Sequence, residues 1–165
     1  MKKLLIIVLL SVTANAQVSV SAAFDPKMAI DGAYETSNRG SLDLILRVAD
    51  RTRNLEVGFQ LEYFKDLKPS YFSYGMFANK IIPIGYKHEL YAGVEANLLM
   101  RKLERSTAGF LSVGANAGYR FYIGNFGIGL EANYKTRPDF KGLWNSSKKG
   151  TESGYITFTY KFNKL

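Results

Sequence analysis

The sequence predicts an all-β protein, an eight-stranded antiparallel up-and-down transmembrane β-barrel that follows a cleaved signal peptide. Three observations support this prediction. Apolar and polar residues alternate with a period of two along eight segments, the polar face of these segments combines charges with glycines, and tight connections alternate with longer polar ones. The 165-residue chain has 11 tyrosines, 11 phenylalanines and 15 glycines, which favour strands joined by tight turns over helices.

Residues 1–16 have the pattern of a secretory signal peptide. Two lysines precede an apolar run, Leu4–Val12, and Ala14–Ala16 supplies the small residues of a cleavage site. The run is too short for a membrane-spanning helix, and an N-terminal core helix is the alternative interpretation. We therefore expect a single barrel domain at residues 17–165, which has no cysteine and relies on packing and hydrogen bonds instead of disulfides.

The clearest element is a β-hairpin at residues 108–135. Apolar residues alternate along both of its strands. Gly124-Asn125 joins them as a type II′ turn, because glycine supplies the positive φ that the first central position needs. A two-residue loop fixes the register. The expected partners are Ile123 with Phe126, Phe121 with Ile128, and Tyr119 with Leu130.

The same alternation predicts six further strands, at residues 17–24, 41–49, 54–64, 70–81, 86–101 and 154–162. Asp25-Pro26 ends the first of them, because proline cannot donate to an interior ladder. Residues 27–40 then form a loop, although residues 28–34 keep the same alternation and could be the strand instead. In the 70–81 strand aromatic residues occupy both faces. We assign its apolar side to Phe72, Tyr74, Met76 and Ala78.

The connections differ in length between the two ends of the predicted strands. Those at residues 50–53, 82–86 and 124–125 are tight, those at 25–40, 102–107 and 136–153 are longer and polar, and 65–69 is short but polar. With both termini at one end, all the tight turns share that end. Membrane barrels have this layout, with short periplasmic turns and longer outer loops.

Two arguments place the apolar face of the strands toward lipid. The interior of an eight-stranded barrel is only just wide enough for side chains, and the many Leu, Phe and Tyr residues of the apolar face would not fit there. A narrow interior needs small residues, and the opposite face carries several glycines. These are Gly58, Gly93, Gly114, Gly118, Gly127, Gly129 and Gly154.

The polar face also supplies charged side chains to the interior, where buried charges are rarely tolerated unpaired. We predict that they form a salt-bridge network that plugs the lumen, and a narrow ion path is the functional alternative. The expected members are Arg47, Glu56, Glu62, Glu95, Arg101, Arg120, Glu131 and Lys135. Arg47 lies opposite Glu56 if Val48 faces Leu55, and Arg120 lies diagonal to Glu131 in the hairpin.

The signal peptide, the eight alternating strands, the loop asymmetry and the aromatic end of the last strand together resemble the small eight-stranded outer-membrane proteins of the OmpA-domain and OmpX type. The resemblance implies a monomer in a Gram-negative outer membrane, among its lipids and lipopolysaccharide. It also implies insertion by the barrel assembly machinery, which recognises a final strand with an aromatic end. Tyr160 and Phe162 fit that assembly signal, although Asn163–Leu165 follows them.

We expect no enzymatic activity. Some barrels of this size are enzymes that act on lipid A or peptides, and these enzyme families use a histidine at the outer rim. The one histidine here, His88, follows the 82–86 turn and is expected at the periplasmic interface. Paired catalytic carboxylates are conceivable among the interior glutamates, but an ion-pair role is favoured. The sequence shows no metal-ligand spacing and no phosphate-binding loop, so we expect no catalytic residue, metal or cofactor.

The outer loops carry the remaining functional surface. Their basic and aromatic residues are expected to contact lipopolysaccharide phosphates, a surface ligand or a host factor, and export argues against nucleic acid. The candidates are Lys102, Arg105, Arg137, Lys141, Trp144, Lys148 and Lys149. The predicted function is envelope structure, adhesion, or lipid or partner binding. The alternatives are a secreted, soluble lipocalin-like barrel that binds a small apolar ligand, or a narrow ion-conducting pore.

Overall fold

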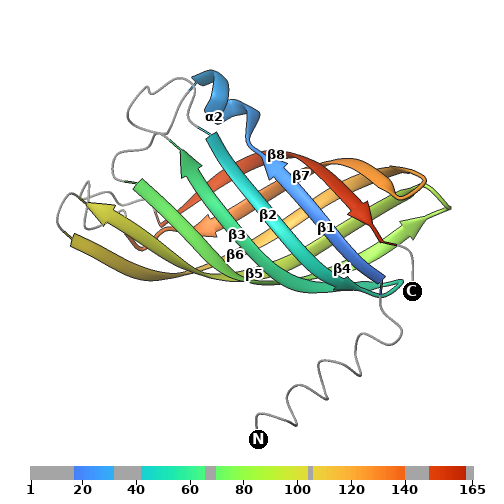
Figure 1. Ribbon diagram of the computed structural model, residues 1–165, viewed down its shortest axis with the longest axis horizontal. Helices are drawn as coiled ribbons and strands as arrows, with labels where there is room; N and C mark the ends of the chain where they lie inside the picture. The colour runs from blue at the N-terminus through green and yellow to red at the C-terminus, as the bar shows by residue number, and fades with distance from the viewer. Residues whose placement is uncertain (1–16, 32–41, 66–69, 104–105, 140–148, 163–165) are drawn as a thin grey trace, which may run out of the picture.

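Eight antiparallel strands form one closed barrel in the computed structural model of the chain, as the sequence predicts (Figure 1). Each strand pairs with its neighbours in sequence order, and the last closes on the first. The structure describes residues 17–31, 42–65, 70–103, 106–139 and 149–162, so the expected signal peptide lies outside them. The elements are β1 (Gln17–Phe24), α2 (Pro26–Asp31), β2 (Leu42–Arg51), β3 (Leu55–Lys65), β4 (Ser70–Ile84), β5 (His88–Leu103), β6 (Ser106–Ile123), β7 (Phe126–Thr136) and β8 (Gly150–Lys161).

The hairpin of β6 and β7 has the predicted turn and register. Ile123 pairs with Phe126, and the other two expected pairs are also present. Gly124 has a φ of 62°, in the left-handed region that glycine enters without strain. The described tight turns and the first strand residue, Gln17, lie at one end of the barrel, which we call the turn end; the opposite end is the loop end (Figure 1).

The register between β2 and β3 differs from the prediction. Val48 pairs with Phe59 and not with Leu55, because β2 continues to Arg51 before the chain turns. Thr52 closes this turn through hydrogen bonds with Leu55. Its backbone N donates to the Leu55 carbonyl at 2.8 Å, and its hydroxyl accepts from the Leu55 N–H at 3.2 Å.

Strand β4 ends later than predicted, at Ile84, and β5 begins later than predicted, at His88. β4 continues through Pro83 to Ile84, and the turn contains Gly85 at a φ of 71°. Pro83 is tolerated because its nitrogen lies on the side of β4 that faces β3. The Ile81 N–H points to the same side and donates to the Asn54 carbonyl. The pairing of β3 with β4 does not extend as far as Pro83, so no ladder hydrogen bond is lost.

The segment after β1 begins with a short helix, so the alternative strand at residues 28–34 is wrong. Pro26 starts α2, where its fixed φ and missing N–H suit the first helical position. Asp25 caps the helix, because its Oδ1 accepts from the N–H of Lys27 at 2.8 Å and of Met28 at 3.4 Å. Among the described residues, no helix is both long and apolar enough to cross a bilayer.

The barrel is polar inside and apolar outside. Leu111 and Leu130 point outward and are 68% and 64% exposed, whereas Arg120 and Glu131 point inward and are 2% and 3% exposed. This is the reverse of the soluble lipocalin-like alternative, which needs an apolar interior. One glycine departs from the prediction, because Gly154 pairs with Ala132 on the outer face and does not face the lumen.

Candidate functional site

Buried ion pairs lie in the described part of the lumen and form three clusters along the barrel axis. The turn-end cluster consists of Arg51, Glu56, Glu89, Arg120 and Lys161. Arg120 Nη1 donates to both Glu56 oxygens at 3.0 Å, and Arg51 lies 2.5 Å from Glu89 and 3.7 Å from Glu56. Lys161 donates to Glu89 at 2.9 Å. Two shared carboxylates thus join three cations at this end.

The central cluster consists of Arg47, Gln60, Tyr91, Glu95 and Glu131. Arg47 holds Glu131 through two parallel hydrogen bonds of 2.6 and 2.8 Å, and its Nε donates to Gln60 at 2.9 Å. The Tyr91 hydroxyl donates to Glu131 at 2.8 Å, and Gln60 Nε2 donates to Glu95 at 2.9 Å. Such a forked pair is geometrically specific and stronger than a single contact.

The loop-end cluster consists of Asp43, Glu62, Lys135 and Tyr155. Lys135 pairs with Glu62 directly, and its Nζ lies 3.7 Å from Glu95 of the central cluster. The Tyr155 hydroxyl donates to Asp43 at 2.6 Å. Lys135 therefore connects the loop-end cluster to the central one.

The ion pairs exchange partners relative to the sequence prediction. Arg47 bonds to Glu131 and Arg120 bonds to Glu56, whereas the expected pairs were Arg47 with Glu56 and Arg120 with Glu131. The corrected β2–β3 register places Gln60 opposite Arg47 and Glu56 opposite Arg51. Long side chains in a narrow barrel then reach across the lumen, so the partners lie on distant strands.

Glycines on the lumen side make room for this network. At Gly118 an added Cβ would lie 2.6 Å from the Leu130 carbonyl oxygen and would collide with the Tyr91 ring. That ring lies under the Arg120 guanidinium, whose Cζ is 4.0 Å from the ring centroid, while its hydroxyl donates to Glu131. Gly118 thus permits the aromatic ring that links the central and turn-end clusters.

Four charged members of the three clusters were not among the predicted lumen charges: Asp43, Arg51, Glu89 and Lys161. Asp43, Glu89 and Lys161 lie on the polar face of their strands, and this alternation was a signal that could have included them. Arg51 was assigned to the turn because no glycine or proline marks where β2 ends. Arg101 was a predicted member but belongs to none of the three clusters. It lies at the loop end, where it donates to the Asp139 carbonyl at 3.3 Å.

An apolar cap covers the loop end of the lumen. It consists of Met28 from α2 with Phe64, Tyr71 and Leu99 from the strands, and Phe110 packs against it. All four cap residues are buried. The helix after β1 therefore contributes a buried side chain at this end of the barrel, which the sequence did not predict.

Arg137 also differs from the exposed loop cation that was expected. It is buried, makes a forked pair with Asp139 at 2.9 Å and lies over the Tyr71 ring at 4.7 Å. Burial lowers the pKa of Arg137, but the hydrogen bonds and charge of Asp139 outweigh it, and the pKa is raised overall. Lys102 and Lys149 are exposed, and Arg105, Lys141, Trp144 and Lys148 lie outside the described residues.

Aromatic residues collect on the outer face near the turn end. The His88 ring contacts Tyr119 and Phe121, at centroid distances of 5.9 and 5.0 Å, and its Nδ1 lies 2.5 Å from the Tyr119 hydroxyl. Tyr160 and Phe162 lie edge to face at 5.1 Å on the outer face of the final strand and the residue after it. Aromatic girdles of this kind border the apolar band of membrane barrels.

Comparison with known proteins identifies the fold. No known family profile matches the sequence, and no curated protein sequence matches it. The structure is similar to the N-terminal β-barrel domain of Pseudomonas aeruginosa OprF, with a TM-score of 0.60 and 13% identity over 88% of this chain and 97% of that one. It is also similar to the Yersinia pestis outer membrane protein Ail, with a TM-score of 0.58 and 15% identity over 89% and 99% of the two chains.

The P. aeruginosa outer membrane protein OprH gives a TM-score of 0.57 and 13% identity, over 90% of this chain and 100% of that one. The chain therefore has the fold of the small eight-stranded outer-membrane barrels.

Proposed function

We propose that the chain is a non-enzymatic outer-membrane barrel with a plugged polar lumen, which acts through its outer surfaces in envelope structure, adhesion or lipid binding. The observation that carries this proposal is the division of the strands, with large apolar side chains outside and paired charges inside. An apolar exterior is soluble in lipid, whereas the paired interior leaves little charge uncompensated. Export by residues 1–16, assembly through Tyr160 and Phe162, and a monomeric state belong to the same proposal.

Membrane fractionation tests the location. The full chain should enter the outer-membrane fraction and show heat-modifiable gel mobility, in which the unboiled barrel migrates differently from the boiled chain. Replacing Tyr160 and Phe162 together by alanine should lower the amount in that fraction. A chain that remains soluble without detergent would overturn the proposal.

Planar-bilayer recording tests the plug. The buried ion pairs of the three clusters support a plug, so we expect no large, steady channels from the wild-type barrel. The double variant Arg47→Ala with Glu131→Ala, which removes the forked central pair, is the matched opening variant. Wild-type channels of high and steady conductance would show that the lumen is open, contrary to the proposal.

The exposed basic residues of the loop end support binding of phosphorylated or sulfated sugars. Lys102 and Lys149 are exposed there, and each positive charge favours a bound anion. The similar protein Ail has been crystallised with the heparin analogue sucrose octasulfate. Binding of lipopolysaccharide and of this analogue should weaken in a Lys102→Ala, Lys149→Ala variant. It should persist in a Lys87→Ala variant, which changes a turn at the opposite end.

A further inference from the structure

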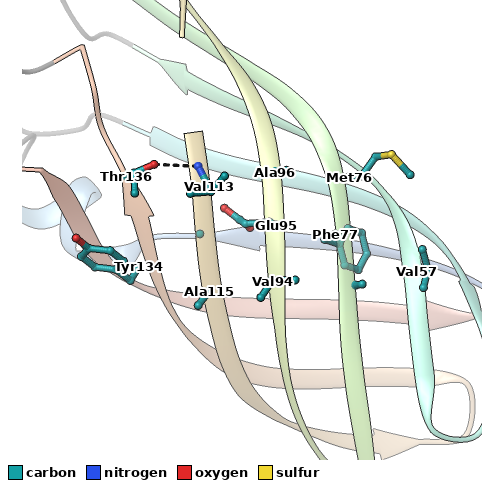
Figure 2. Close-up of a pocket in the computed structure, with 12 residues that line it drawn as sticks. Val57, Met76, Phe77, Val94, Glu95, Ala96, Val113, Ala115, Tyr134 and Thr136 are labelled. Carbon is teal, nitrogen blue, oxygen red and sulfur yellow. Dashed lines mark hydrogen bonds between the residues drawn. The ribbon is translucent and has the colours of Figure 1, made fainter. Parts of the chain in front are cut away.

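The outer face of the barrel has a groove over β3–β7, where small side chains lie next to one another. Its volume is about 630 Å³. Figure 2 shows Met76 and Val57 on one side of it and Tyr134 on the other, and the short side chains Val94, Ala96, Val113 and Ala115 lie between them. The floor is formed by Ala78, Val94, Ala96, Val113 and Ala115.

Residue size explains the groove. Other parts of the outer face carry long side chains, for example Phe59, Leu61 and Tyr63 on β3. Ala96 pairs with Met76 on β4 and with Val113 on β6, and Val94 pairs with Ala78 and Ala115. Adjacent short side chains on three strands thus leave a hollow that a flexible hydrocarbon chain can fill.

A lysine, Lys80, lies at the turn end of this groove. Lys80 is the next outward-facing residue after Ala78 on β4, and it pairs with Leu55 and Ala92. Its side chain is exposed on the outer face, and none of the ion pairs among the described residues includes it. A lysine on a lipid-facing surface is costly at the bilayer midplane, and the cost falls near the interface.

The neighbouring aromatics place Lys80 near that interface. Ala92 pairs with Ala117, and one outward position closer to the turn end Leu90 pairs with Tyr119. Tyr119 contacts His88 in the aromatic group of the turn end. Lys80 can therefore extend its ammonium along the surface to the headgroup level while its methylene chain stays in the apolar region.

We propose that Lys80 and the groove bind an anionic phospholipid of the periplasmic leaflet. The phosphate pairs with the Lys80 ammonium, and one acyl chain lies along Ala78, Val94 and Ala96 toward the loop end. The direction decides the leaflet, because a lipid whose headgroup is at the turn end and whose tail points to the loop end belongs to the periplasmic side. This inference rests on the proposed location in the outer membrane.

Photocrosslinking tests the site. The full chain is reconstituted in phosphatidylcholine vesicles that contain a trace of phosphatidylglycerol or phosphatidylcholine probe, each with the same diazirine-bearing acyl chain. The phosphatidylglycerol probe should label β5 and β6 at the groove about fivefold more than the phosphatidylcholine probe, because one lysine near the surface attracts an anionic lipid by roughly that factor. Lys80→Met should reduce the label to the phosphatidylcholine level, and Ala96→Leu should reduce it by filling the groove.

Two variants serve as matched controls. Lys87→Met removes a lysine from the β4–β5 turn, and Ala132→Leu enlarges an outward alanine of β7 that does not line the groove. Both should keep wild-type labelling. Equal labelling around the barrel, or labelling that Lys80→Met does not change, would overturn the lipid site. Crosslinks between two copies through cysteines placed at Ala96 would also overturn it, because the groove would then hold a second barrel.

The heat-modifiable mobility of each sample separates this inference from the proposed function. A wild-type chain that inserts and folds but shows no preferred label contradicts only the lipid site. A wild-type chain that fails to insert contradicts the membrane location and the lipid site together. Variants that fold like the wild type allow the label to be compared directly.

Discussion

The two ends of the lumen are closed by different chemistry. At the turn end, three cations share two carboxylates, and all five residues belong to strands. At the loop end, an apolar cap covers the lumen, and one of its members, Met28, comes from the helix that follows β1. The turn end is therefore held by charge pairing on a fixed frame, whereas the cap depends partly on a connecting segment.

This difference indicates how the stability of each end should respond to substitutions. Removing one partner of a buried ion pair leaves an uncompensated charge with no solvent to replace it. Removing an apolar cap residue loses packing and leaves a cavity, but it strands no charge. We therefore expect the loss of a charge partner at the turn end to destabilise the barrel strongly, and the loss of a residue of the apolar cap to disturb order locally.

The largest expected effect is at the turn end. Arg120→Met should lower the free energy of unfolding by about 3–5 kcal/mol, because Glu56 loses the guanidinium that contacts both of its oxygens. Denaturant titration followed by gel mobility in vesicles measures this change. The double variant Arg120→Met with Glu56→Gln should recover most of the loss. A single variant as stable as the wild type would contradict the view that this pair closes the turn end.

The next largest effect concerns the space beside the Tyr91 ring, with no change of charge. Gly118→Ala should cost up to about 3 kcal/mol, because its Cβ would collide with the Tyr91 ring and crowd the Leu130 carbonyl. Gly154→Ala is the control, since a Cβ there meets no atom within 4 Å. Thermal unfolding of the two variants measures the contrast. Equal stabilities would mean that the lumen has spare room beside Tyr91.

The sequence predicts the fold well because its evidence is local. Gly124-Asn125 marks a turn, and a two-residue turn determines every pair of the β6–β7 hairpin. The apolar alternation then assigns the faces of most strands. The β2–β3 turn lacks such a marker, because Thr52 closes it through its backbone and hydroxyl, and the predicted register was shifted.

The ion-pair partners depend on information that is not local. Arg47 and Glu131 are 84 positions apart, and Arg120 and Glu56 are 64 apart. Which side chains meet across the lumen depends on barrel closure and on the stagger of all eight strands, so one shifted hairpin changes the expected partners. The composition of the lumen could be predicted from alternation, whereas its pairing required the three-dimensional structure.

A smaller effect tests the apolar cap. Met28→Ala should lower the free energy of unfolding by roughly 2 kcal/mol, the lower end for a buried methionine, because the cap lies at one end of the barrel. Hydrogen exchange of α2 should increase, while the amides of the turn-end strands stay protected. Ile30→Ala on the same helix is the control, because Ile30 is 70% exposed. Faster exchange throughout the barrel would show that the two ends are not independent.

The smallest effect concerns the helix that carries Met28 into the cap. Asp25→Ala removes the acceptor of the Lys27 and Met28 N–H groups and should cost about 1 kcal/mol, with exchange increased mainly in α2. Asp25→Asn keeps an oxygen acceptor at the helix start and should retain most of the stability. If alanine and asparagine variants exchange alike, the cap is positioned by the packing of Met28 alone. A difference between them shows that a capping hydrogen bond outside the barrel helps to close its loop end.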